Sequence, residues 1–138
     1  IQRAEKRTIV FISHDLNVIN YLCDRVVVMY LGKVVESGEI GAVYEDTRHP
    51  YTQALLASRP SFDPRARTAV APLAGDPPSP VDPPSGCRFR TRCPIAQPIC
   101  AEQEPPLAPV SGATNHSAAC HFADRIKAAT PGVAHAAP

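Results

Sequence analysis

The feature that most constrains the fold is an uninterrupted apolar run, Thr8–Ile12, that ends in the polar triplet Ser13-His14-Asp15. A run without polar alternation predicts a strand buried on both faces of a mixed or parallel sheet. Apolar residues then recur at helical spacing, which predicts a helix over 16–22 with Asp15 as its N-cap. Open α/β sheets bind ligands where a buried strand ends and a helix begins. The sequence therefore predicts an α/β fold with a nucleotide or phosphate site, and His14 at its edge.

Further elements are expected before residue 60. Residues 26–36 predict a β-hairpin, because two apolar runs flank the turn Leu31-Gly32-Lys33. Ser37-Gly38 is expected to end the second strand of that hairpin. Apolar faces at helical spacing predict a short helix over 40–44 and another helix that starts at His49-Pro50.

Composition separates a globular front half from a back half built of loops. Hydrophobic residues make up 44% of the chain, and most of the 16 prolines follow residue 59. The formal net charge of +1 offers no basic stripe, so nucleic acid is not expected as a partner. The sequence starts at Ile1 and shows no signal peptide and no apolar run long enough to cross a membrane. We expect a piece of a longer cytoplasmic chain.

Three motifs occur in an order that identifies a family. ISHDL is followed by CDRVVVMYLGKVVESG and then by HPYTQALL. This order resembles the C-terminal end of an ABC-transporter ATP-binding subunit, and HPYTQALL is similar to the oligopeptide/dipeptide importer branch. The resemblance implies that 1–60 is the C-terminal piece of a P-loop ABC ATPase domain and that 61–123 is a loop-rich, cysteine-rich accessory domain. Residues 124–138 are expected to form a disordered tail.

The resemblance implies that His14 is the switch-loop histidine, which contacts the γ-phosphate of ATP and the attacking water. A neutral imidazole suits this task, because it can donate one hydrogen bond and accept another. The plainer alternative is a histidine satisfied by the backbone at a strand end. Ser13 and Asp15 are expected to shape the turn and cap the helix. A hydrolase built on His14 and Asp15 is disfavoured, because adjacent residues on an extended strand point to opposite faces.

ATP hydrolysis needs motifs that this sequence lacks. It has no G-x-x-x-x-G-K-[ST] loop, no apolar strand ending in Asp-Glu and no signature of the Leu-Ser-Gly-Gly-Gln type. In the family these motifs lie N-terminal to the matching segment. Most of the ATP and Mg²⁺ site is therefore expected upstream, and this chain alone is expected to be inactive.

The resemblance also implies an assembly. The family couples ATP binding and hydrolysis to peptide uptake, so the expected partners are a second ATP-binding subunit, in a homo- or heterodimer, and transmembrane permease subunits. The expected location is peripheral, on the cytoplasmic face of the cell membrane.

Four cysteines in the back half predict a thiolate metal site. They are spaced C-x5-C-x6-C-x19-C, at Cys87, Cys93, Cys100 and Cys120. Structural zinc generally uses two close C-x2-4-C pairs, whereas the cysteines of an iron–sulfur cubane can come from separate loops. We expect a [4Fe-4S] cluster, with zinc and free thiols as alternatives. Three arginines would stabilise the negative charge of a cluster: Arg88, Arg90 and Arg92.

The family resemblance includes this region, since the cysteine-rich tail of some importer ATPases holds a [4Fe-4S] cluster. His116 and His121 are expected at the surface or beside the ligands, or as substitute ligands for zinc. Cys23 is expected to be a small buried hydrophobe. A cluster would be structural, because the back half has few large apolar residues. The competing hypothesis is a free-standing iron–sulfur or zinc-binding module without ATPase activity.

Overall fold

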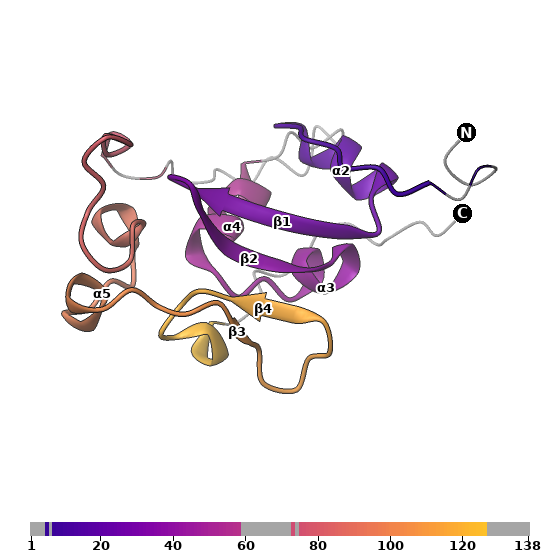
Figure 1. The fold of residues 1–138 in the computed structure, drawn as a ribbon. Helices are drawn as coiled ribbons and strands as arrows, with labels where there is room; N and C mark the ends of the chain where they lie inside the picture. Colours follow the sequence, from indigo (N-terminus) through magenta and orange to yellow (C-terminus); the bar gives the residue numbers. More distant parts are fainter. Residues whose placement is uncertain (1–4, 6, 59–72, 74, 127–138) are drawn as a thin grey trace, which may run out of the picture.

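The computed structural model describes residues 5, 7–58, 73 and 75–126, which form a mixed α/β structure (Figure 1). The predicted α/β class is confirmed. One antiparallel sheet has the strand order β1-β2-β4-β3. Its strands are β1 (Arg25–Tyr30), β2 (Lys33–Glu39), β3 (Ala108–Pro109) and β4 (His116–Ala118). The sheet therefore joins residues from both sides of the expected boundary at residue 60.

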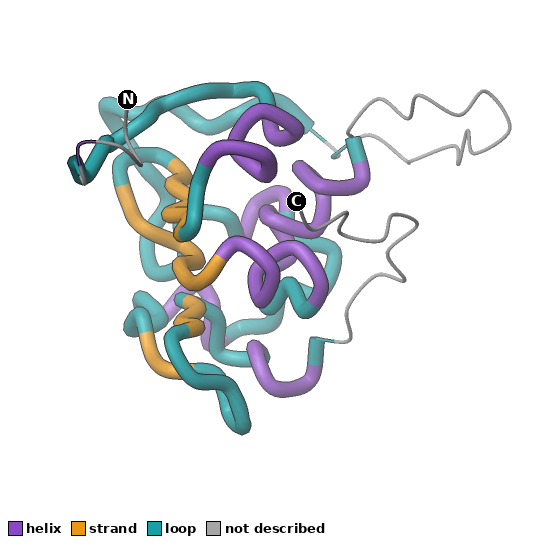
Figure 2. Tube along the Cα trace, turned by 90° about the vertical axis from the view of Figure 1, so that its right-hand side faces the viewer, coloured by secondary structure: helices purple, strands orange, loops and turns teal. Residues whose placement is uncertain are grey.

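Most of the helices lie to one side of this sheet (Figure 2). The longer ones follow or precede the hairpin: α2 (Leu16–Leu22), α3 (Ile40–Glu45) and α4 (Pro50–Ala57). Shorter turns belong to the cysteine-containing segment and the end of the described chain: η1 (Arg90–Arg92), α5 (Ile99–Glu102) and η2 (Ala123–Arg125). Among the described residues, none of these helices has the length and apolar character needed to cross a bilayer.

Local sequence signals explain the helices and the hairpin. The Asp15 carboxylate accepts hydrogen bonds from the N–H groups of Asn17 and Val18, so the predicted N-cap of α2 is confirmed. His49 caps α4 and Pro50 occupies its first turn, where the missing N–H costs nothing. The turn between β1 and β2 places Leu31 and Gly32 at positive φ, and the predicted hairpin is confirmed.

Two predictions for strands are wrong. The run Thr8–Ile12 forms no strand, and Ile9, Val10 and Ile12 are 57%, 88% and 93% exposed. A strand buried on both faces needs neighbours, and no described strand pairs with this run. Ser37-Gly38 does not end β2, because both residues pair with β1 and with β4. Gly38 is needed there, since a Cβ would lie 3.0 Å from the Asn115 carbonyl oxygen.

The hydrophobic core has two parts. One part lies between the hairpin and α3 and contains Val26, Ile40 and Val43, with Ile19 of α2 packed against it. The other part joins Tyr30 and Val35 of the hairpin to Phe89 of the cysteine-rich segment, which is 1% exposed. The Tyr30 and Phe89 rings meet edge to face, with centroids 5.2 Å apart. Burial of Phe89 thus holds the cysteine-rich segment on the hairpin.

A buried carboxylate, Glu36, connects three segments. It is fully buried in β2 and accepts hydrogen bonds from the backbone N–H groups of Arg48 (2.6 Å) and His49 (3.1 Å). The ring of His116 in β4 lies with Nε2 2.8 Å from a Glu36 carboxylate oxygen. A buried charge is costly unless hydrogen-bonded, so this site fixes β2, β4 and the start of α4 together.

Glu36→Ala is expected to lower the free energy of unfolding by about 3–5 kcal/mol, because it leaves three buried donors without an acceptor. Glu36→Gln keeps the shape but presents an N–H group to other donors, so an intermediate loss is expected. Glu39→Ala is the matched control, since Glu39 is an exposed residue at the end of the same strand. Urea unfolding monitored by circular dichroism measures all three. Equal stability of Glu36→Ala and Glu39→Ala would contradict the role of Glu36.

Candidate functional site

His14 lies in a bend immediately before α2, and its side chain is exposed. The flanking residues shape this turn, as predicted: the Ser13 hydroxyl accepts a hydrogen bond from the Asp15 N–H (3.0 Å), and Asp15 caps the helix. The His14 ring has no hydrogen-bond partner within the described part of the chain. An exposed imidazole at the start of a helix is free to contact a ligand that another part of the protein holds.

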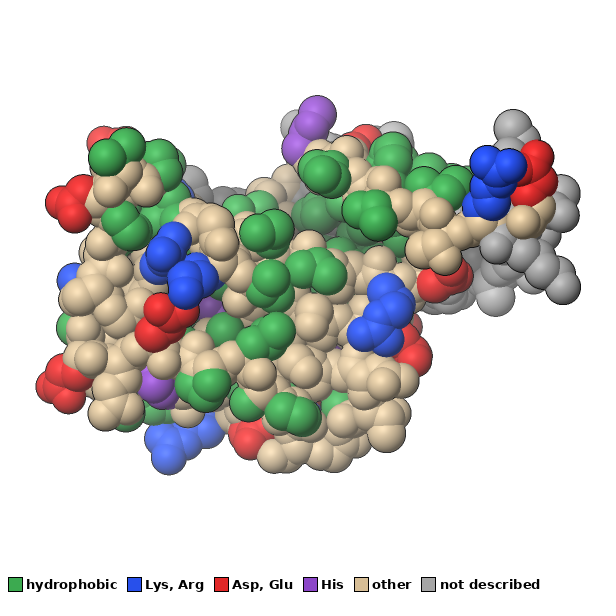
Figure 3. All heavy atoms as spheres, in the orientation of Figure 1, with side chains coloured by type: hydrophobic (Ala, Val, Ile, Leu, Met, Phe, Trp, Pro, Cys, Tyr) green, Lys and Arg blue, Asp and Glu red, His purple; other side chains and the backbone are tan. Residues whose placement is uncertain are grey.

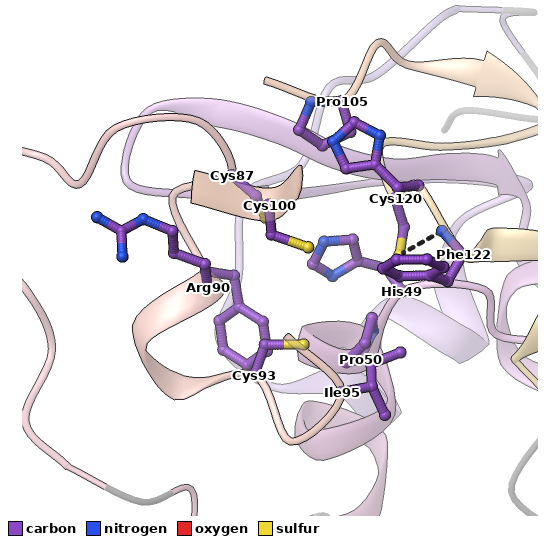
Figure 4. Close-up of a pocket in the computed structure, with 12 residues that line it drawn as sticks. His49, Pro50, Cys87, Arg90, Cys93, Ile95, Cys100, Pro105, Cys120 and Phe122 are labelled. Carbon is purple, nitrogen blue, oxygen red and sulfur yellow. Dashed lines mark hydrogen bonds between the residues drawn. The ribbon is translucent and has the colours of Figure 1, made fainter. Parts of the chain in front are cut away.

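The structure brings the four predicted cysteine ligands to one small cavity. Figure 4 shows this cavity, to which Cys87 and Cys93 contribute from either side of η1, Cys100 from α5 and Cys120 from the residues after β4. A backbone hydrogen bond from the Cys87 N–H to the Cys100 carbonyl oxygen (2.8 Å) holds two of these segments together. Residues far apart in the sequence thus present their thiols to the same space.

Gly86 permits this approach. It has φ +60°, and a Cβ at this position would lie 2.4 Å from the Cys100 carbonyl oxygen. A side chain would therefore meet backbone atoms as well as a strained conformation.

Burial makes three of the cavity thiols poor acids. It raises the pKa of Cys87 and of Cys93, and raises the pKa of Cys120 to about 11. Neighbouring thiols add to the effect, because a second thiolate nearby would repel the first. The thiols of Cys87, Cys93 and Cys120 are therefore protonated at neutral pH, and a bound metal would have to displace their protons.

The arginines do not gather at the cavity as predicted. Arg90 lines it, but its Nε donates to the Ser85 carbonyl oxygen at 2.9 Å. Arg88 donates to the Leu31 carbonyl oxygen in the hairpin turn, and an Arg92 nitrogen lies 3.5 Å from the Leu73 carbonyl oxygen. The hydrogen bonds of all three arginines hold loops in place, and Arg90 is the one of the three that also lines the cavity.

The remaining predicted residues are distributed differently. His116 is 1% exposed and bound to Glu36, so the prediction that it lies at the surface or serves as a zinc ligand is wrong. His121 lines the cavity, with Nε2 3.1 Å from the Gln103 carbonyl oxygen. Cys23 is half-buried and lies between α2 and β1, away from the cavity-lining residues.

The cavity itself is small. It has about 10 Å³ of free volume, the room that one water molecule needs. Over residues 7–58 and 75–126, no three cysteine, histidine or carboxylate side chains are grouped closely enough to hold one metal ion. The thiols therefore surround a common space without forming a ready single-ion site.

Sequence reasoning missed His49 as a cavity residue. It assigned His49-Pro50 only to the start of a helix, yet the His49 ring is 1% exposed and lines the cavity with the four cysteines. Burial lowers its pKa to about 4, so the ring is neutral. The only local signal is the N-cap position, which does not reveal what the other side of the ring faces.

Comparisons with known proteins agree with the order of the motifs. Residues 35–100 match the family model described as "Oligopeptide/dipeptide transporter, C-terminal region". A peptide import ATP-binding protein of Brucella ovis is 52% identical over 120 residues, which cover 87% of this chain and 37% of that protein. The oligopeptide transport ATP-binding protein OppF of Escherichia coli is 47% identical over 128 residues, 91% of this chain and 37% of that protein. The chain thus spans little more than a third of these relatives.

Gly86→Ala is expected to lower the free energy of unfolding by about 2 kcal/mol more than Gly75→Ala does. Both glycines have positive φ, but a Cβ at Gly75 meets nothing within 4 Å, whereas one at Gly86 meets the Cys100 carbonyl. The difference between the two variants isolates the close approach of the cysteine segments. Urea unfolding of both variants measures it, and equal losses would show that this approach is not required.

Proposed function

Since the resemblance to the C-terminal part of oligopeptide/dipeptide ABC transporter ATP-binding subunits is confirmed, we propose that this chain serves in such a subunit, which couples ATP binding and hydrolysis to peptide uptake. The observation that supports this most strongly is the 52% identity across 87% of the chain, from a relative named for peptide import and ATP binding. The competing hypothesis, a free-standing metal-binding module, has no relative in its support among these proteins.

In this proposal His14 contacts the γ-phosphate of ATP and the attacking water. Its exposed ring at the start of α2 supports the role, because Ser13 and Asp15 carry the structural tasks of the turn. Phosphoryl transfer depends on positioning and on stabilisation of charge, to which a single hydrogen bond from an imidazole contributes. The phosphate loop and the magnesium ligands come from the part of the subunit that precedes these residues in the family.

The proposed partners are a second ATP-binding subunit and transmembrane permease subunits, at the cytoplasmic face of the membrane. Exposed apolar side chains support a larger assembly. Val27 and Met29 on the outer face of β1 are 59% and 56% exposed, and Ile9–Ile12 adds further apolar surface (Figure 3). Apolar surface of this kind marks contacts with other protein segments.

We further propose that residues 61–123 form a cysteine-rich accessory domain whose thiols hold a [4Fe-4S] cluster. The donor set fits: four thiols from separate segments line one cavity, and its other lining residues are mostly apolar. The cavity has room for about one water, so loading would require the loops to move apart. Zinc is the weaker candidate, because no single-ion group exists among the described residues.

A bound cluster would supply four metal–sulfur bonds that cross-link the loops, which is a structural contribution. The chain's own residues orient this site. The hydrogen bond from Cys87 to Cys100 sets two ligands side by side, and Phe89 anchors the segment to the hairpin. The Cys120 sulfur accepts a hydrogen bond from the Phe122 N–H (3.4 Å), which fixes its direction.

His14→Ala is expected to reduce ATP hydrolysis about 100-fold while ATP binding is kept, because it removes a group that acts mainly in the transition state. The assay uses a chimera in which this chain replaces the corresponding C-terminal part of the E. coli relative. Asn17→Ala, in the first turn of α2, is the matched control and should hydrolyse ATP at the parent rate. Parent-like hydrolysis by His14→Ala would contradict the proposed contact.

The proposed cluster predicts that substitution of Cys23 and substitution of a cavity cysteine have different effects. After anaerobic reconstitution with ferrous iron and sulfide, the parent chain and Cys23→Ser should bind about four iron atoms and absorb visible light. Cys93→Ser and Cys120→Ser should lose both properties, because each removes a thiolate from the cavity. A parallel incubation with zinc tests the alternative: uptake of one zinc ion by a chain that binds no iron and gives no visible absorption would favour zinc, and binding of neither metal would leave free thiols.

A further inference from the structure

The His49 side chain is held from two directions. Its Nδ1 accepts a hydrogen bond from the Tyr51 N–H (3.1 Å), which caps α4. Its backbone N–H donates to a carboxylate oxygen of Glu36 (3.1 Å). The ring is 1% exposed and lies against Phe89, with ring centroids 5.8 Å apart. The position and orientation of the imidazole are therefore set by the fold before any ligand arrives.

These contacts determine which ring nitrogen carries the proton. A backbone N–H can only donate, so Nδ1 must be the acceptor nitrogen of the Tyr51 hydrogen bond. In a neutral imidazole the other nitrogen then carries the hydrogen. His49 thus presents an Nε2–H donor. Its Nδ1 lone pair is already used, so the ring in this tautomer is not a metal ligand.

The cavity offers this donor few acceptors other than sulfur. Its lining consists of apolar side chains, the four cysteines, Arg90 and the two histidines. Arg90 is itself a donor and is directed to Ser85, and the His121 Nε2 lies beside the Gln103 carbonyl oxygen. His49 lines the same cavity as Cys93, Cys100 and Cys120, and Figure 4 draws its ring on the side of the cavity where Cys100 and Cys120 lie.

We propose that His49 donates a hydrogen bond through Nε2–H to a sulfur atom of the cysteine-ligated cluster, and so sets how firmly the cluster is held and at what potential it is reduced. This inference rests on the cluster put forward under Proposed function. It gives the residue that begins the HPYTQALL segment a role beyond the helix cap.

The physical effect follows from the charge on sulfur. A cluster with four thiolates is negative, and reduction makes it more negative. An N–H group that points at a sulfur stabilises the reduced form more than the oxidised form, so it raises the reduction potential. It also makes the thiolate a poorer base and slows its reprotonation, so the cluster is lost more slowly.

Two substitutions separate the helix cap from the donor. Asparagine is a good N-cap whose side-chain oxygen can accept the Tyr51 N–H, but its amide is too short to replace Nε2. Glutamine is longer and places its amide N–H near the position of Nε2, but it caps poorly. His49→Asn thus keeps the cap and removes the donor, and His49→Gln does the reverse.

The experiment reconstitutes the 138-residue chain and both variants with iron and sulfide under anaerobic conditions. It then measures the rate of cluster loss to a chelator and the midpoint potential in a spectroscopic redox titration. His49→Asn should lose the cluster about tenfold faster and show a more negative potential. His49→Gln should recover most of the parent rate and potential, although its metal-free form unfolds more easily.

The outcomes distinguish this inference from the proposal on which it rests. A parent chain that binds no iron overturns both. A parent chain that binds the cluster, together with a His49→Asn variant of unchanged loss rate and potential, overturns the hydrogen bond and leaves the cluster standing. Equal acceleration in His49→Asn and His49→Gln also overturns it, because a general packing defect then explains both.

Discussion

The buried carboxylate of Glu36 is the interaction on which the rest of this structure depends. It sits in the middle of β2 and binds the backbone before α4 on one side and His116 of β4 on the other. The residues that bind Glu36, which are Arg48, His49 and His116, follow it in the sequence by 12, 13 and 80 positions. Hydrophobic contacts alone would allow β4 to slide along β2, because β4 has only three residues. A buried charge that needs specific donors allows one register.

The parts of the fold that local chemistry determines could be predicted. Asp15 caps α2, the turn at Leu31-Gly32 joins two β-branched runs, and His49-Pro50 starts α4, all within a few residues of their signals. The run Thr8–Ile12 was mispredicted because its apolar pattern specifies burial, and burial depends on neighbours that the described chain does not provide. An apolar pattern shows that a segment needs to be buried, but it does not show which other segments bury it.

The candidate site, like the fold, could be predicted only in part. Cysteine spacing was sufficient to group Cys87, Cys93, Cys100 and Cys120, and the structure brings all four to one cavity. The environment of the thiols was not predictable, because it depends on the hairpin and on the start of α4. Glu36 and His49 belong to the front half by sequence, yet they position the cysteine-rich half. Nothing in the sequence near the cysteines points to residues so far upstream.

The two edges of the sheet differ in a way that limits how it can grow. At one edge, β3 is two residues long and contains Pro109, which has no N–H to offer a further strand. At the other edge, β1 is six residues long, and its outer side pairs with no strand in the described part of the chain. Extension by another polypeptide segment is thus directed to β1, while the β3 edge is protected against uncontrolled self-association. The two edges of the sheet therefore differ. The short proline-containing strand β3 hinders further strand pairing at one edge, whereas β1 leaves it possible at the other.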